Sequence, residues 1–351
     1  MSRETVNLKQ LAAALGLSQT TVSRALNGFP EVSERTRERV VAAADKLNYR
    51  PSASAASLAT GKARTIGHVV PLAEHMMINP HFSDFLAGAG EVYARSGYEM
   101  LIRVVSAEDE LGVYRDLART GRVDGFVVHG PLSDDPRIPL LSSLNVPFVV
   151  HGRCSHADSN FSFMDVNNKE AFRRATDFLL DLGHRRMALI NGLETMNFAS
   201  RRRQGFEEAF ESRGLEADAE LIFGRDMVEP YGYEVGRTVL GAPNRPTAIL
   251  LSSMLPAIGL VRAMGELGLK AGEDVSIIVF DDQLSFLQSS DTMRGVPFFT
   301  VMRSSIRAAG QRVAEMLMEQ INTPDAEPIH ELWEAEFVLG RSTGPVPPRT
   351  H

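Results

Sequence analysis

The chain has 351 residues, enough for two or three compact units, and its 44% hydrophobic content is ordinary for a globular protein. It contains no run of about 18 apolar residues and no apolar signal-peptide core behind its polar start, so we expect a cytoplasmic protein without a membrane span. The net charge of -7 is uneven, because residues 1–62 hold nine Lys or Arg against five Asp or Glu. A basic head on an acidic body is typical of a protein that binds nucleic acid through the head alone.

The sequence contains no motif for catalysis or metal binding. Nucleophile elbows, phosphate-binding loops, paired metal motifs and Cys-His clusters are all missing from it. Its one cysteine, Cys154, cannot form an internal disulfide, which agrees with the cytoplasm, and we interpret it as an inert buried thiol. The sequence therefore predicts neither an enzyme nor a cofactor or metal site.

Three short helices are predicted within residues 1–50. The first has Asn7 as its N-cap and ends at Gly16, the second is capped by Ser18, and the third by Ser33. Their predicted buried residues are Leu8, Leu11, Ala12, Leu15, Val22, Leu26, Val40, Val41, Ala44 and Leu47. Two helices joined by a tight glycine turn and followed by a third form a helix-turn-helix unit.

The second helix, in the stretch SQTTVSRALNG, is unusually polar. In a helix-turn-helix unit this helix lies in the major groove, where the Arg24 guanidinium can pair with guanine and Gln19 and Thr20 can meet base edges. Short polar side chains nearby suit phosphate contacts, which fix register without selecting sequence. These are Ser18, Thr21, Asn27, Ser33 and Thr36. On periodicity alone, a solvated polar helix in any helical domain remains an alternative.

Residues 51–63 are predicted to be a hinge. Pro51 ends the third helix, and the alanine-rich segment SASAASLATG that follows is too short to form a stable helix by itself. Its one large apolar side chain is Leu58. An exposed leucine is odd in a plain linker, but it suits a wedge in the minor groove of DNA.

From residue 64 onward, short apolar strands alternate with helical patterns such as residues 82–96 and 170–182. The predicted strands are TIGHVV, YEMLIRVV, VDGFVVHG, VPFVVHG, RRMALING, TAILLS and DVSIIVFD. Strands of this kind are buried on both faces, so they predict βαβ units in doubly wound parallel sheets, with sites at the carboxyl ends of the strands. The length fits two such lobes, followed by a proline-rich, flexible tail at 345–351.

The stretches LKQLAAALGLSQTTVSRALNG, VSERTRERVVAAADKLNYRPSASAASLATG and RTIGHVVP resemble the DNA-binding head and hinge of the LacI/GalR family of bacterial repressors. The resemblance implies the base contacts given above and a homodimer, or a tetramer, on a pseudopalindromic operator. It also implies that two hinge helices pair in the minor groove around Ala55 and Leu58, with the leucine in a central CG step. Ala56 departs from the pattern, because many members have arginine there.

Six further stretches resemble the effector-binding body of the same family: NPHFSDFLAGA, RVDGFVVHG, MDVNN, LGHRRMALING, RRQGFEEAF and DVSIIVFDD. The resemblance implies the fold of periplasmic sugar-binding proteins, with no catalysis and with a mono- or disaccharide bound between two lobes. It assigns residues of about 64–165 and 303–325 to the N-lobe, and about 166–302 and 326–344 to the C-lobe. The chain would cross between the lobes three times.

Candidate effector residues follow from the matching motifs. The resemblance implies that Arg202 reaches the effector, and its guanidinium suits vicinal hydroxyls or a carboxylate. Asp281 follows the strand SIIVF and would accept from sugar hydroxyls, with a helix N-cap as the alternative. His81 and Phe82 begin the first helix of the body, where an aromatic face can stack on a sugar ring. Ser253 is the fifth candidate.

Several positions depart from the family or stay ambiguous. Ser253 and Met254 stand where most relatives have Asn-Asp, and Ser304-Ser305 replaces the usual Gln-Pro near the third crossing. Asp165 and Asn167, near the second crossing, are either effector contacts or structural. The segment NGLE at 191–194, with a phenylalanine just beyond it, is similar to members that sense α-glucosides.

The sequence thus predicts an effector-switched transcription regulator, most simply a repressor. Whether the effector releases DNA or strengthens its binding is left open. The competing hypothesis is a cytoplasmic or secreted sugar-binding protein, or a sugar-processing enzyme, whose basic head is incidental. That hypothesis predicts a signal peptide or a catalytic constellation.

Overall fold

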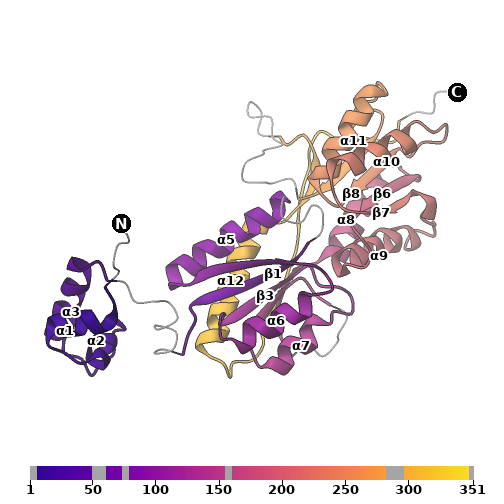
Figure 1. Cartoon of the computed structure of the whole chain (residues 1–351). Coiled ribbons are helices and arrows are strands. Elements are labelled where there is room, and N and C mark those ends of the chain that lie inside the picture. The colour runs from indigo at the N-terminus through magenta and orange to yellow at the C-terminus, as the bar shows by residue number, and fades with distance from the viewer. Residues whose placement is uncertain (1–5, 50–60, 73–78, 155–159, 282–295, 348–351) are drawn as a thin grey trace.

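The structure, a computed structural model, describes residues 6–49, 61–72, 79–154, 160–281 and 296–347. These residues form a three-helix head and a two-lobed α/β body (Figure 1). No helix in these ranges is long and apolar enough to cross a membrane.

The head consists of α1 (Leu8–Leu15), α2 (Gln19–Leu26) and α3 (Glu34–Lys46). The side chain of Asn7 caps α1, and Gln10 completes the predicted capping box. Gly16, with φ of 66°, ends α1 in the left-handed conformation that glycine adopts at no steric cost. The chain can therefore reverse within a few residues, which produces the predicted helix-turn-helix geometry.

The core of the head is small and mostly as predicted. Its buried residues are Leu11, Ala12, Val22, Ala25, Val32, Val40 and Ala44. The prediction for Val41 was wrong, because its side chain is 44% exposed. Val41 follows the buried Val40 on α3, and successive residues of a helix point in directions about 100° apart.

The N-lobe is a fully parallel sheet with strand order β11-β5-β4-β3-β1-β2. Its strands are β1 (Thr65–Pro71), β2 (Glu99–Val105), β3 (Gly125–His129), β4 (Phe148–His151), β5 (Ser162–Val166) and β11 (His330–Trp333). One face is covered by α5 and α12, the other by α6 and α7 (Figure 1). These helices are α5 (Pro80–Ser96), α6 (Glu110–Arg119), α7 (Arg137–Leu144) and α12 (Ile306–Asn322).

The C-lobe sheet has the order β12-β10-β9-β8-β6-β7, and β12 alone is antiparallel among its described strands. Its strands are β6 (Met187–Asn191), β7 (Ile222–Gly224), β8 (Ala248–Leu251), β9 (Ser276–Phe280), β10 (Thr300–Arg303) and β12 (Glu336–Val338). One face packs against α8 and α9, and the other against α10 and α11. The elements are α8 (Asn168–Asp181), α9 (Asn197–Glu211), the 3₁₀ helix η1 (Ala219–Leu221), α10 (Glu229–Leu240) and α11 (Met254–Glu266).

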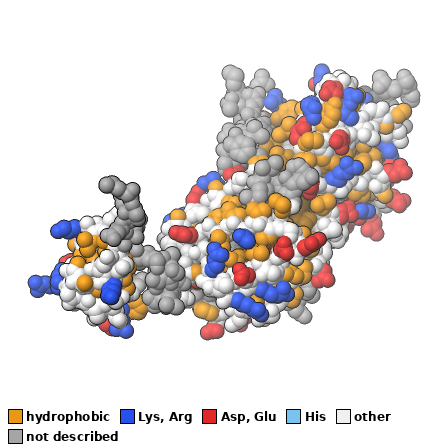
Figure 2. Space-filling view, in the orientation of Figure 1, with side chains coloured by type: hydrophobic (Ala, Val, Ile, Leu, Met, Phe, Trp, Pro, Cys, Tyr) orange, Lys and Arg blue, Asp and Glu red, His pale blue; other side chains and the backbone are white. Residues whose placement is uncertain are grey.

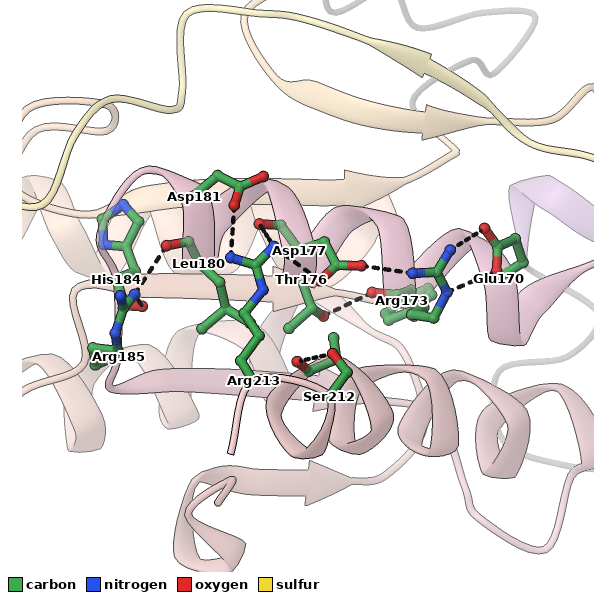
Figure 3. Close-up of polar contacts among 12 residues, drawn as sticks. Glu170, Arg173, Thr176, Asp177, Leu180, Asp181, His184, Arg185, Ser212 and Arg213 are labelled. Atoms are coloured by element: carbon green, nitrogen blue, oxygen red, sulfur yellow. Dashed lines mark hydrogen bonds and ion pairs between the residues drawn. The ribbon is translucent and has the colours of Figure 1, made fainter. Parts of the chain in front are cut away.

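The helices α8 and α9 pack as a close pair. A Cβ atom at Gly205 of α9 would overlap the carbonyl oxygen of Lys169 on α8, so only glycine allows this approach. Ion pairs line the exposed side of the pair (Figure 3). Arg173 bonds Glu170 and Asp177 on its own helix, and Arg213, which follows α9, bonds Asp177 at 3.2 Å. Such exposed pairs add little stability singly, and of these three only the Arg213 pair joins the end of α9 to α8.

Three segments connect the lobes: β5 to α8, β10 to α12, and β11 to β12. The predicted return to the C-lobe at about 326 was wrong, because β11 is hydrogen-bonded to β5 in the N-lobe sheet. The last crossing therefore follows Trp333. Edge strands such as β11 are exposed on alternate residues, and this pattern does not reveal which sheet they join.

The predicted flexible tail at 345–351 was wrong in its first part. The backbone N–H of Val346 donates to the carbonyl of Leu182 at 3.1 Å. His184 is fully buried beside this segment and contacts the Gly344 carbonyl at 3.1 Å. Residues 344–346 are therefore docked on the C-lobe, while residues 348–351 lie outside the described part of the chain.

Candidate DNA-binding surface and interlobe site

The three predicted base-contacting residues share an exposed surface on α2. Gln19 and Thr20 occupy its first turn, and Arg24 lies four residues after Thr20, on the same side of the helix. All three side chains are exposed, while Val22 and Ala25 on the opposite side are buried against the other helices. The helix therefore offers its polar face to a partner outside the head.

Two of the predicted phosphate contacts also cap helices. Ser18 accepts from the N–H of Thr21 at 3.0 Å, and Ser33 accepts from that of Thr36 at 3.4 Å. In each pair the two hydroxyl groups are also 2.8 Å apart. The hydroxyls thus lie at helix N-termini, where the backbone dipole favours an anionic group such as phosphate.

Asn27 is partly committed to its own helix, since its amide nitrogen donates to the Ser23 carbonyl at 2.9 Å. The same nitrogen also lies 3.4 Å from the Ser23 hydroxyl, so the amide oxygen is the group left for other partners. The predicted hinge contacts Ala55 and Leu58 lie outside the described residues. Basic side chains project from the visible face of the head, and acidic ones are spread over the body (Figure 2).

In the body, three predicted effector residues meet between the lobes. The Nε2 atom of His81, at the start of α5 in the N-lobe, is 3.1 Å from the Ser253 hydroxyl, which begins α11 in the C-lobe. The Nδ1 atom of His81 is 4.0 Å from Asp281 Oδ2, beyond the end of β9. Burial lowers the pKa of His81 to about 4, and the nearby Arg202 charge adds to this effect. The imidazole is therefore neutral at pH 7 and bridges the two lobes.

Arg202 lies on α9 and is buried, with 6% of its surface exposed. Its Nε donates to Asn168 Oδ1 and its Nη1 to the Ser252 carbonyl, both at 2.7 Å. The guanidinium carbon is 3.9 Å from the centre of the Phe280 ring. Burial lowers the pKa of Arg202 to about 9, opposed by the charges of Asp281 and Asp165. Arg202 thus stays cationic at pH 7, and its Nη2 makes no hydrogen bond within the described residues.

Phe82 is less available than predicted. Only 7% of its surface is exposed, and its ring packs edge-to-face with that of His129 at 5.1 Å. His129 in turn contacts the fully buried His68 at 2.9 Å. Phe82 therefore belongs to the N-lobe core beneath the interlobe site and leaves little ring face for a ligand.

The lobes also touch through backbone atoms beside α9. The N–H of Asn197 donates to the Pro131 carbonyl at 3.2 Å, and Leu132 forms an antiparallel bridge with Met196. Pro131 and Leu132 follow β3 in the N-lobe, whereas Met196 and Asn197 begin α9 in the C-lobe. The helix that carries Arg202 is therefore held to the N-lobe at its first residue.

The ambiguous crossing residues now have partners. Asp165 accepts from Arg153 at 2.8 Å, and Asn167 caps α8 and donates to Glu334 at 2.7 Å. Ser304 and Ser305 line a cavity of about 430 Å³ at the second crossing, and Asp165 and Asn167 lie at the first, so the predicted numbering of both crossings was wrong by one. Trp333, the one tryptophan of the sequence, shares this cavity, so its fluorescence can report on the crossings.

Sequence reasoning missed the residues that orient Arg202. Asn168 lies in the MDVNN stretch beside Asn167, and nothing in the sequence shows which of the two amides contacts Arg202. Ser252 contributes a backbone carbonyl, which any residue could provide. Phe280 ends the predicted strand SIIVF, and its position directly before Asp281 was the one available signal.

Comparison with known proteins agrees with this arrangement. The profile of bacterial regulatory proteins of the lacI family matches residues 7–52, and that of the periplasmic binding protein-like domain matches residues 176–343. The fold and the two sites define a helix-turn-helix transcription regulator with a periplasmic-binding-protein-like body. The HTH-type transcriptional regulator AglR of Rhizobium meliloti (strain 1021) is 44% identical over 345 residues, covering 98% of this chain and 96% of AglR. The chain belongs to the lacI family of bacterial regulatory proteins.

Other relatives extend the comparison. The HTH-type transcriptional regulator RafR of Escherichia coli is 30% identical over 336 residues, covering 95% of this chain and 98% of RafR. The solved complex of the transcriptional regulator CelR with cellobiose gives a TM-score of 0.70 at 26% identity, covering 96% of this chain and 99% of CelR. The lac repressor dimer bound to operator and the anti-inducer ONPF has the same fold, with a TM-score of 0.82 at 24% identity over 97% and 100% of the two chains.

Proposed function

We propose that the protein is a cytoplasmic repressor that binds a pseudopalindromic operator as a homodimer and is switched by a saccharide held between its lobes. The observation that carries the proposal is the pairing of two sites in one chain. The exposed polar face of α2 suits the major groove, and Arg202, Asp281 and His81 meet between the lobes.

On DNA, different polar side chains of the head contact bases and phosphates. Arg24, Gln19 and Thr20 contact base edges, while the capping hydroxyls Ser18 and Ser33 contact phosphates. Thr21, Asn27 and Thr36 add phosphate contacts. The hinge at 51–63, with Ala55 and Leu58, enters the minor groove between the two heads, where the leucine unstacks one base step.

The dimer rests on apolar surface that the single chain leaves open. The edge strand β2 exposes 38% of Ile102 and 39% of Val104, and α11 exposes 41% of Ile258. An edge strand with apolar side chains and unpaired backbone groups is a site for pairing with another chain. A second copy on these surfaces would place two heads on the two halves of the operator.

The effector is an uncharged saccharide, because the buried cation Arg202 already has carboxylate partners. Asp281 and Asp165 both lie near Arg202, and His81 stays neutral. Hydroxyl groups can accept from the guanidinium and donate to the carboxylate without adding a net charge to a buried site. We take α-glucosides as the first class to test, with cellobiose as a β-linked comparison because CelR was solved with it.

Switching follows from the contacts of His81. Its imidazole contacts the Ser253 hydroxyl and lies close to the Asp281 carboxylate, so a ligand that binds these C-lobe groups must displace the imidazole. The N-lobe then rotates relative to the C-lobe and moves the hinge segments of the dimer. A saccharide can shift this equilibrium only by binding one arrangement better than the other.

The test is a DNA-binding titration of the full-length protein. Operator binding should weaken by at least about a hundredfold between roughly 50 and 200 mM salt, as phosphate contacts require, and should exceed binding to random DNA. In the second arm, maltose, sucrose, trehalose and cellobiose are added singly while operator affinity and the thermal midpoint are measured. At least one should raise the midpoint and change operator affinity.

The variant Arg202→Ala separates the two sites. It should lose the saccharide response and keep the operator affinity of the ligand-free protein, because Arg202 lies in the body. If the wild-type protein binds no DNA at low salt, the repressor proposal is wrong and a sugar-binding protein or enzyme becomes the better hypothesis. If Arg202→Ala changes DNA binding alone, the effector site is wrong.

A further inference from the structure

The side-chain amide of Asn168 has only one orientation that satisfies its neighbours. Its nitrogen donates to the Val166 carbonyl at 2.9 Å and to Asp165 Oδ1 at 3.3 Å. Both partners are acceptors, so the amide oxygen must face the other way, toward Arg202 Nε at 2.7 Å. Asn168 is also buried, with 3% of its surface exposed, so water does not compete for these bonds.

Asp165 continues this chain of bonds into the N-lobe. Its second oxygen, Oδ2, accepts from Arg153 Nε at 2.8 Å, and only 6% of the residue is exposed. Asp165 belongs to β5, and Arg153 follows β4, both in the N-lobe sheet. Asn168 is the first residue of α8 in the C-lobe. The bond between Asp165 and Asn168 therefore joins the lobes at the first crossing.

We propose that Asn168 is the positioning residue for the Arg202 guanidinium, and that the relay Arg153–Asp165–Asn168–Arg202 couples the ligand arginine to the N-lobe. The proposal rests on the proposed function in one respect, the assignment of Arg202 as an effector contact. Within the relay, only Arg202 touches the ligand.

The arginine needs such a partner because its other contacts do not fix the direction of its N–H groups. The rings of Phe280, Phe198 and Phe172 lie 3.9, 4.8 and 5.3 Å from the guanidinium carbon, and they enclose the cation without accepting a directed hydrogen bond. The Ser252 carbonyl holds Nη1 alone. One further bond, to Nε, stops the guanidinium from rotating in its own plane and directs Nη2 one way. Asn168 provides that bond.

Asp165 accepts a hydrogen bond at each of its two oxygens, one from Arg153 and one from Asn168. Burial raises the pKa of Asp165, and the adjacent Arg153 opposes this effect. An amide at position 165 keeps one oxygen acceptor and turns an N–H group toward Arg153 or Asn168, so Asp165→Asn breaks the relay at one bond.

The first experiment measures Arg202 directly and needs no ligand. Hydrogen exchange of its Nε–H is followed by NMR in the full-length dimer labelled with ¹⁵N-arginine, and Arg202→Lys assigns the resonance. Asn168→Ala should speed this exchange at least about tenfold. The control is Asn167→Ala, which removes the neighbouring amide and the α8 cap but does not contact Arg202. Unchanged exchange in Asn168→Ala, or an equal change in the control, overturns the positioning role.

The second experiment tests the coupling. Maltose affinity is measured by Trp333 fluorescence and by calorimetry, and should fall at least about tenfold in Asn168→Ala but less than threefold in the control. In Asp165→Asn, maltose should still bind within about threefold, while its effect on operator affinity should shrink. An intact maltose effect on operator affinity in this variant would show that Asp165 is only structural and overturn the relay.

The two proposals can fail separately. If wild-type protein binds none of the four saccharides, the proposed effector class is wrong, and the exchange measurement still decides whether Asn168 positions Arg202. If a saccharide binds the wild type and Asn168→Ala equally well, the effector class stands and the positioning role is overturned.

Discussion

Arg24 differs from the neighbouring arginine Arg37 in what surrounds it. Arg37 pairs with Glu34 at 3.0 Å and donates to the Phe29 carbonyl, so its guanidinium is committed to the head. Arg24 is exposed on α2 and makes no ion pair within the described residues. Its planar donors are therefore available to a base, and a lysine would keep the charge but lose the two-pronged geometry.

We expect Arg24→Lys to remove discrimination at one operator base pair. The loss should be about 1–3 kcal/mol of specific binding, while affinity for random DNA stays within a factor of two because the charge is kept. Fluorescence anisotropy on operator and scrambled DNA measures both. Arg35→Lys on the exposed start of α3 is the control and should leave the ratio unchanged. Equal losses on both DNAs would mean that Arg24 contacts phosphate instead of a base.

Residues fixed by local geometry were predictable from the sequence, and residues fixed by distant partners were not. The side chains of the caps Asn7, Ser18 and Ser33 accept from backbone N–H groups three residues away, so the sequence alone indicated these caps. Asn168 meets Arg202 across 34 positions of chain, and its role depends on which way its amide faces. Only the packed structure determines that orientation.

Among the elements, α8 and α9 place the candidate site. Asn168 begins α8 and Arg202 lies on α9, and Gly205, about one turn of α9 beyond Arg202, lets the two helices approach closely. Buried strands and amphipathic helices were predicted well because their patterns are strong. The edge strand β11 was assigned to the wrong lobe because its half-exposed pattern fits either sheet.

The contact at Gly205 predicts a coupled loss. Gly205→Ala places a methyl group against the Lys169 carbonyl, so the helices must separate, at a cost of about 1–3 kcal/mol in unfolding free energy. Maltose affinity should fall as well, because Asn168 and Arg202 are drawn apart. Urea unfolding and calorimetry measure the two effects.

The control for Gly205→Ala is Gly112→Ala on α6. A Cβ at Gly112 meets nothing within 4 Å, so alanine should stabilise the helix by roughly 0.5–1 kcal/mol and leave maltose binding unchanged. If Gly205→Ala lowers stability with unaltered maltose affinity, the helix spacing does not control the arginine.

At the scale of the whole molecule, the N-lobe buries histidines that stay uncharged. Burial lowers the pKa of His68 to about 3 and that of His81 to about 4. The pKa of His129 lies well below its usual value, because burial and the neighbouring histidines disfavour its charged form. His68 and His129 contact each other in the core, beneath the residues that meet between the lobes.

These histidines predict a loss of stability in acid. In the unfolded chain each imidazole titrates near pH 6.5, so below that pH the unfolded state binds protons that the folded state does not. The unfolding free energy should be level above pH 7 and fall as pH drops from 6.5 toward 4. Each histidine contributes a slope of up to about 1.4 kcal/mol per pH unit. The double variant His68→Leu, His129→Phe should lose about two such contributions, measured by urea unfolding at pH 7, 6 and 5.

The control is Val127→Ala, which creates a cavity in the same lobe without removing a titrating group. It should lower the unfolding free energy equally at every pH and keep the wild-type slope. An unchanged slope in the double variant would show that the acid sensitivity arises outside this histidine pair.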